Sequence, residues 1–166
     1  MRKLILLLLV VCTQVCTTHA QIQGDKRSTV WSYDTSKNEM TDSPMFIASI
    51  SADYLLELPK GNYYATLTIS KTEQAERVTL ISDDHCHFMK SDNIQFVNMR
   101  FDEEPMISVN FTYINASKPY HIEFEDPGTL IAKIKHAHVL RIQAKIEGMN
   151  SEVMRFHVSG LNSTKL

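Results

Sequence analysis

Two pairs of histidines come closest, in residue type and spacing, to a metal site in this chain. His85 and His87 lie two residues apart, as do His136 and His138. On a β-strand such a pair projects to one face and could offer two nitrogen ligands to a metal ion. Neither pair belongs to a Cys-x-x-Cys or His-Glu-x-x-His motif, and His136 falls near an expected helix end, where its positive charge favours the helix dipole. We therefore expect surface or capping histidines, and no metal or other cofactor.

Nucleophilic and acid–base catalysis have less support. The chain has no Gly-x-Ser-x-Gly motif, and Cys86 is close to histidines only along the sequence. Asp83-Asp84 and Glu103-Glu104 are adjacent carboxylates, but neighbours on an extended chain point in opposite directions, so neither pair forms an acid–base couple. We interpret them as solvated turn residues and predict that the protein is not an enzyme.

The remaining polar candidates lie on expected strands. Arg100 and Asp102 share one face of their strand, so they could form a polar pair or contact a ligand; a structural ion pair at a sheet edge is the alternative. Four basic residues share the exposed face of the last hairpin: Arg141, Lys145, Arg155 and His157. This basic face could receive an anionic partner, or it could be a solvated face whose charges protect the strand ends.

Aromatic residues gather in the first half of the chain. They are Trp31, Tyr33, Tyr54, Tyr63 and Tyr64. Aromatic side chains stack on sugars and anchor protein interfaces. We expect Trp31 and Tyr63 in the core, whereas Tyr64 points outward and is the candidate for a ligand or an interface.

Apolar and polar residues alternate along most of the chain, which indicates strands with one buried face. The expected strands cover residues 45–51, 63–70, 77–83, 94–102, 106–115, 138–147 and 152–160. Turn residues separate these segments. The pattern predicts an all-β fold, a single antiparallel β-sandwich of about eight strands with one short helix, over residues 30–161.

The helix is expected just after Asp126, a suitable N-cap, with Pro127 at its first position. Its apolar residues recur at helical spacing: Leu130, Ile131, Ile134 and Ala137. Such a helix would close one end of the sandwich or cover a sheet edge.

The last hairpin allows a prediction of register. Its inward residues are even-numbered in both strands, Leu140 and Phe156 among them, so the loop needs an odd number of residues. A loop over residues 148–150 satisfies this condition and places Arg141 opposite His157.

The N-terminal residues 1–20 have the layout of a secretory signal peptide. Arg2 and Lys3 precede an apolar run, and Ala20 provides a small residue before the expected cleavage site. The run is shorter than the roughly 20 residues that span a bilayer, so we expect no transmembrane segment after cleavage. Residues 21–29 are expected to be a flexible lead-in and residues 162–166 a C-terminal tail. The protein is predicted to be periplasmic or secreted.

Charge and cysteine content narrow the classes of partner. The signal holds 2 of the 17 Lys and Arg residues and none of the 19 Asp and Glu, so the mature chain has a formal charge of −4. This balance argues against nucleic-acid binding. Cys86 is the only cysteine after residue 20, so we expect no internal disulfide and a buried, inert Cys86; pairing between chains or a reactive thiol is the alternative. A lipid anchor on Cys12 or Cys16 is the alternative, disfavoured by the bulky residues before both.

Several short motifs occur in order along the chain. They are Trp31-Ser-Tyr, Met40-Thr41-Asp42, Arg100-Phe101-Asp102, the lead-in from Phe124 to Leu130, and Phe156-His-Val-Ser-Gly160-Leu161. In these motifs the chain resembles small exported bacterial β-sandwich proteins, among them accessory proteins associated with type VI secretion and proteins of the invasion-associated locus B type. Proteins of these groups are generally non-enzymatic or uncharacterised, so the resemblance implies only this class and no functional residues. Many of those proteins carry a cysteine pair, which this mature chain lacks.

The functional expectation is therefore a non-catalytic exported protein that contacts another envelope or secreted protein. A module that binds a small ligand or a glycan through exposed aromatic residues is the alternative. A hydrolase with a site assembled from distant residues has no support in the sequence.

Overall fold

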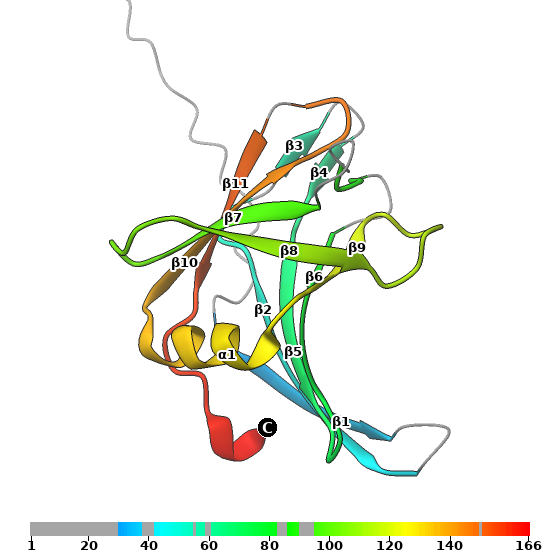
Figure 1. Cartoon of the computed structure of the whole chain (residues 1–166), viewed down its shortest axis with the longest axis vertical. Helices are drawn as coiled ribbons and strands as arrows, with labels where there is room; N and C mark the ends of the chain where they lie inside the picture. The colour runs from blue at the N-terminus through cyan, green and yellow to red at the C-terminus, as the bar shows by residue number, and fades with distance from the viewer. Residues whose placement is uncertain are drawn as a thin grey trace, which may run out of the picture.

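The computed structural model describes residues 30–37, 42–54, 56–58, 61–82, 86–89, 95–149 and 151–166. The expected signal peptide and lead-in lie outside the described residues, as do Asp83, Asp84 and His85. Figure 1 shows the described part as a curved sheet with one α-helix packed in its lower half. None of the helices in the described ranges is long and apolar enough to span a membrane.

The strands follow the alternation seen in the sequence. They are β1 (Ser32–Lys37), β2 (Pro44–Ser51), β3 (Leu56–Leu58), β4 (Gly61–Tyr63), β5 (Thr66–Lys71), β6 (Glu76–Ile81), β7 (Phe96–Phe101), β8 (Ile107–Tyr113), β9 (His121–Phe124), β10 (Val139–Lys145) and β11 (Ser151–His157). All seven expected strands are present, with ends shifted by a few residues. The pattern missed β1, β3, β4 and β9. These strands are short or lack alternating apolar residues.

Nine strands form one antiparallel sheet in the order β1-β2-β5-β6-β9-β8-β7-β10-β11, and β3 and β4 form a separate hairpin. Strand β8 belongs to both halves of the large sheet, because residues 107–110 pair with β7 and residues 111–113 with β9. In Figure 1, β7 and β8 accordingly run across the view, whereas β2, β5 and β6 run along it. The predicted all-β class with one α-helix is confirmed. Its layers come from a single sheet that folds over at β8.

The core lies between the two halves of this sheet. Leu67 and Ile69 of β5 are fully buried on one side, and Leu140 and Ile142 of β10 are buried on the other. Alternation along each strand sends the intervening residues outward. Cys86 is buried in the same core, as expected.

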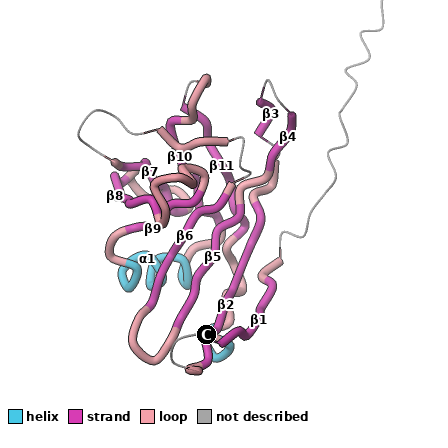
Figure 2. Tube along the Cα trace, turned by 90° about the vertical axis from the view of Figure 1, so that its right-hand side faces the viewer, coloured by secondary structure: helices cyan, strands magenta, loops and turns pink. Residues whose placement is uncertain are grey.

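Helix α1 (Pro127–His136) closes one end of the folded sheet and begins where predicted. Asp126 is the N-cap, and its carboxylate accepts a hydrogen bond from the Thr129 amide at 3.3 Å. Three apolar side chains of the helix are buried: Leu130, Ile131 and Ile134. Figure 2 shows α1 beneath β9 and beside the lower part of β6.

The two ends of the folded sheet are tied together by residues far apart in sequence. The Trp31 indole, buried as predicted, donates a hydrogen bond to the carbonyl of Val158 at 2.9 Å. The Tyr33 hydroxyl accepts a hydrogen bond from the Asn162 amide at 2.6 Å, just before the 3-10 turn η1 (Ser163–Lys165). These bonds hold the C-terminal segment against β1.

The predicted register of the last hairpin is wrong. Arg141 lies opposite Arg155, not His157, and residues 146–150 connect the two strands. The cause is a second pairing on the other side of β10: the Met89 amide donates to the Lys145 carbonyl at 2.8 Å, and Ile146 bridges Phe88. This pairing keeps the chain extended beyond the end of β10 before the chain turns. The loop is therefore longer than predicted, and its number of residues is odd, as predicted.

A cap prediction follows from the backbone of Asp126, which has a left-handed φ of +51°. Asp126→Ala should lower the free energy of unfolding by about 1 kcal/mol, because the cap is lost and the left-handed backbone keeps its cost. Asp126→Gly also loses the cap but removes that backbone cost. The free energy of unfolding in urea should therefore be highest for wild type, lower for Asp126→Gly and lowest for Asp126→Ala. A glycine variant less stable than the alanine variant would contradict the assignment.

Candidate binding face

Three arginines stand in cross-strand register on the outer face of the sheet. Arg100 of β7 pairs with Arg141 of β10, which pairs in turn with Arg155 of β11. We call these residues the arginine row. Adjacent strands lie about 4.8 Å apart, and like charges directly opposite one another are destabilising. The row therefore needs counter-charges and hydrogen-bond acceptors.

The turn after β7 supplies a counter-charge and hydrogen-bond acceptors at the Arg100 end of the arginine row. Oε2 of Glu103 is 2.7 Å from Nη2 of Arg100, and its Oε1 is 3.6 Å from Nη2 of Arg141. Arg141 also donates to the Asp102 carbonyl at 2.7 Å, and Arg100 to the Glu104 carbonyl at 3.1 Å. The Glu103 side chain is 81% exposed, so its carboxylate is an accessible anion between two arginines.

Asp53 supplies the counter-charge at the other end. Its amide donates to the Arg155 carbonyl at 2.8 Å, and its Oδ2 lies 3.5 Å from Nε of Arg155, an ion pair too long for a good hydrogen bond. The same oxygen is 2.9 Å from Nε2 of His157. The Asp53 side chain is only 9% exposed, and among the described residues its Oδ1 has no hydrogen-bond partner. Sequence reasoning missed Asp53, because no motif or strand pattern marks it.

Asp102 has a different role from the one expected. Its carboxylate accepts hydrogen bonds from the amides of Val139 at 2.8 Å and His138 at 3.0 Å. The bond from Val139 has the largest effect and the bond from His138 the next largest, and both lower the pKa of Asp102 below its ordinary value. The predicted pair with Arg100 does not form, because β7 ends at Phe101 and a left-handed φ of +44° at Asp102 turns its carboxylate toward β10. The predicted edge location is also wrong, since β7 lies between β8 and β10.

The side chains of Glu103 and Glu104 also contact different residues. Glu103 contacts the arginine row, whereas Oε2 of Glu104 lies 2.9 Å from Nζ of Lys133 on α1. They point to different partners, as their position on neighbouring residues predicts. They are ion-pair partners as well as turn residues, which the expectation of plain solvated residues did not include.

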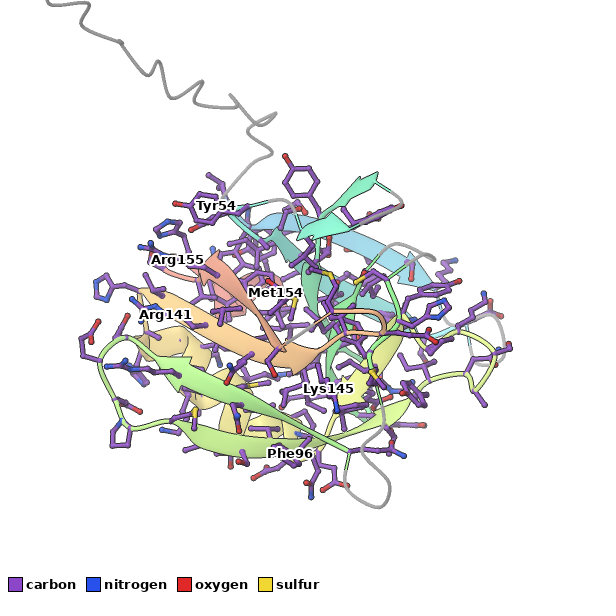
Figure 3. All side chains as sticks on the ribbon, turned by 90° about the horizontal axis from the view of Figure 1, so that it is seen from above. Tyr54, Phe96, Arg141, Lys145, Met154 and Arg155 are labelled. Atoms are coloured by element: carbon purple, nitrogen blue, oxygen red, sulfur yellow. The ribbon has the colours of Figure 1, made fainter. Side chains whose placement is uncertain are left out.

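Exposed apolar side chains flank the arginine row. Val153 of β11 is 55% exposed and Met106 is 60% exposed. Between them lies a hollow of about 160 Å³ lined by Asn98, Met99, Arg100, Met106, Arg141, Gln143 and Val153. Figure 3 looks onto this part of the molecule and shows Arg141 and Arg155 at one side, with Lys145 and Phe96 toward the other. The face therefore combines cationic and apolar groups.

A second hollow lies on the other side of Val153. This groove of about 350 Å³ is lined by Tyr54, Leu56, Met149, Glu152, Val153, Met154 and Arg155. Tyr54 stands over it with 67% of its surface exposed, next to Arg155 in Figure 3. The two hollows and the arginine row form one continuous surface, because Val153 lines both hollows.

The structure brings most of the predicted site residues to this surface. Arg100, Arg141 and Arg155 form the row, His157 contacts Asp53, and Lys145 is exposed opposite Ser151. Two predicted residues do not contribute to it. The Asp102 carboxylate is bonded to the amides of His138 and Val139, and Tyr64 is half-buried in the link between β4 and β5 and lines neither hollow.

No metal-binding arrangement is evident in the described part of the chain. None of its His, Cys, Asp and Glu residues form a group of three or more that could hold an ion. His136 belongs to the last turn of α1, where a positive charge favours the helix dipole, and His138 is largely exposed. His87 lies 2.8 Å from the Glu147 carboxylate.

No protein-family model, curated protein or solved structure matches this chain. The resemblance to exported accessory proteins remains a prediction.

The lowered pKa of Asp102 predicts a pH dependence. A carboxylate whose pKa is lower in the folded than in the unfolded protein stabilises the fold above its unfolded pKa, and that contribution is lost as the pH falls through the folded value. Asp102→Asn should therefore be less stable than wild type near pH 7, and the difference should shrink below the ordinary value of 3.8. Urea unfolding across this range measures it; a difference independent of pH would contradict the assignment.

Proposed function

We propose that this chain is a non-catalytic exported protein that binds an acidic surface of another envelope or secreted protein. The binding surface is the outer face of β7, β10 and β11. The observation that carries the proposal is the alignment of three arginines across three strands beside exposed Val153 and Met106.

The alignment is unfavourable for folding alone, because it places like charges in direct cross-strand contact. Its composition suits recognition. Arginine, methionine and aromatic residues are enriched at protein interfaces, and a guanidinium can bind a carboxylate through two parallel hydrogen bonds. A partner that offers carboxylates and an apolar side chain would satisfy both the row and the hollow beside it.

Glu103 indicates how a partner would be accommodated. Its exposed carboxylate already occupies the space between Arg100 and Arg141, at 2.7 Å and 3.6 Å from their Nη2 atoms. Exposed ion pairs contribute only about 0–1 kcal/mol, so a carboxylate of the partner can replace that of Glu103 at little cost. Glu103 then acts as an internal competitor that partly neutralises the row until the partner binds.

The compartment is part of the proposal. The signal peptide predicted in residues 1–20 directs the chain out of the cytosol, so its partner is sought among periplasmic, envelope and secreted proteins. The charge of −4 predicted for the mature chain makes the basic outer face a local exception, which is a basis for orienting an acidic partner.

The first test compares two arginines in different parts of the sheet. Arg141→Gln removes the centre of the row, whereas the control Arg77→Gln removes a 56% exposed arginine of β6 that pairs with Glu123. Proteins captured from an envelope extract of the producing cells by wild type and by Arg77→Gln should be lost with Arg141→Gln. Capture of the same proteins by all three would contradict the proposal, once circular dichroism shows that each variant is folded.

The second test uses the internal competitor. Glu103→Gln should strengthen binding of the captured partner severalfold, because the row loses its own carboxylate while keeping its arginines. Glu104→Gln on the same turn is the control, since Glu104 pairs with Lys133 and not with the row. Surface plasmon resonance measures both affinities. Equal or weaker binding by Glu103→Gln would argue against displacement.

A further inference from the structure

One edge of β11 is free of the large sheet, and Asp53 covers part of it. Strand β11 is the last strand of the nine-stranded sheet. The carbonyl of Arg155 accepts the Asp53 amide, so the main chain of Arg155 points away from β10. Main-chain groups alternate in direction along an antiparallel strand, so Val153, two residues earlier, also directs its N–H and C=O to the free edge. In the described part of the chain, no residue pairs with these two groups across that edge.

The groove runs along this same edge. Tyr54 and Leu56 line it on one side, and Val153 and Arg155 of β11 line the other. Its volume of about 350 Å³ is sufficient for one or two side chains of an added segment. A strand that paired with Val153 would project alternate side chains into the groove and onto the outer face.

The charges around the edge select the kind of strand. Arg155 and Arg141 lie at one end, and Lys145 lies at the other, paired with Ser151 in the register of β10 and β11. A second copy of this chain would bring an identical cationic face beside this one. An acidic segment would instead place its carboxylates near cations at both ends.

We propose that the partner binds by adding an extended acidic segment to β11 as a new edge strand. The main chain of Val153 bonds to that segment, an apolar side chain enters the groove beside Tyr54, and flanking carboxylates meet Arg155 and Lys145. This inference rests on the proposed function and specifies the form in which the partner is recognised.

The test removes one outward-facing main-chain donor. Val153→Pro deletes the N–H of Val153, and proline is tolerated on an edge strand where that N–H faces solvent. Val153→Thr keeps the N–H and the branched side chain as the matched control. The probe is a fluorescent synthetic peptide of alternating aspartate and valine, followed by fluorescence anisotropy. We expect Val153→Pro to bind roughly tenfold more weakly than Val153→Thr, which measures the contribution of the side chain alone.

The outcomes separate this inference from the function on which it rests. Equal binding by Val153→Pro and wild type, with loss in Arg141→Gln, would overturn strand addition and leave the acidic-partner proposal standing. A peptide that binds none of the proteins, or binds equally when lysine replaces its aspartates, would overturn this recognition mode. In that case, capture of an envelope protein by wild type but not by Arg141→Gln would still support the proposed function. If Val153→Pro does not fold, hydrogen exchange of the Val153 amide in wild type decides: the peptide must slow it, and unchanged exchange overturns the inference.

Discussion

The carboxylate of Asp102 joins three parts of the molecule. Asp102 follows β7 and has a left-handed backbone conformation. Its carboxylate accepts hydrogen bonds from the amides of His138 and Val139, between α1 and β10. Its carbonyl accepts a hydrogen bond from Arg141. The Asp102 side chain therefore helps to hold the start of β10 against β7, in addition to the pairing of the two strands. Because Arg141 is anchored to the same residue, the geometry of the arginine row depends on this turn.

The rest of the outer face follows from that arrangement. With β10 placed against β7, Arg141 lies between Arg100 and Arg155, and the row is bounded by an anion at each end: exposed Glu103 and largely buried Asp53. The two anions differ in what they permit. The Glu103 side chain is 81% exposed, whereas Asp53 is largely buried and is held by its amide and by its contact with His157. The proposed displacement by a partner's carboxylate therefore concerns the exposed end of the row alone.

Alternation of apolar and polar residues predicted the larger strands and the all-β class, because each of those strands buries one face. It missed β1, whose sequence Ser-Tyr-Asp-Thr-Ser-Lys has no apolar period, and β9, which has only 4 residues. Local capping residues predicted α1 correctly. The basic residues of the last hairpin were recognised as one face, but the row itself depends on the register of β10.

That register is set by long-range contacts that no local pattern reveals. Pairing of residues 87–89 with the end of β10 lengthens the loop before β11 and moves Arg155, rather than His157, opposite Arg141. The role of Asp102 depends on a left-handed backbone turn, and that of Asp53 on contact between the ends of the folded sheet. These contacts arise from three-dimensional packing. The sequence therefore indicates which residues belong to the outer face, but not which partner each of them contacts.

Hydrogen exchange at the amides of His138 and Val139 tests the role of Asp102 most directly. In wild type both amides should be protected, because the carboxylate of Asp102 accepts them. In Asp102→Ala both should exchange much faster, whereas the amide of buried Leu67 in β5 should keep its protection. Unchanged protection of His138 and Val139 in that variant would show that the position of β10, and with it the arginine row, does not depend on Asp102.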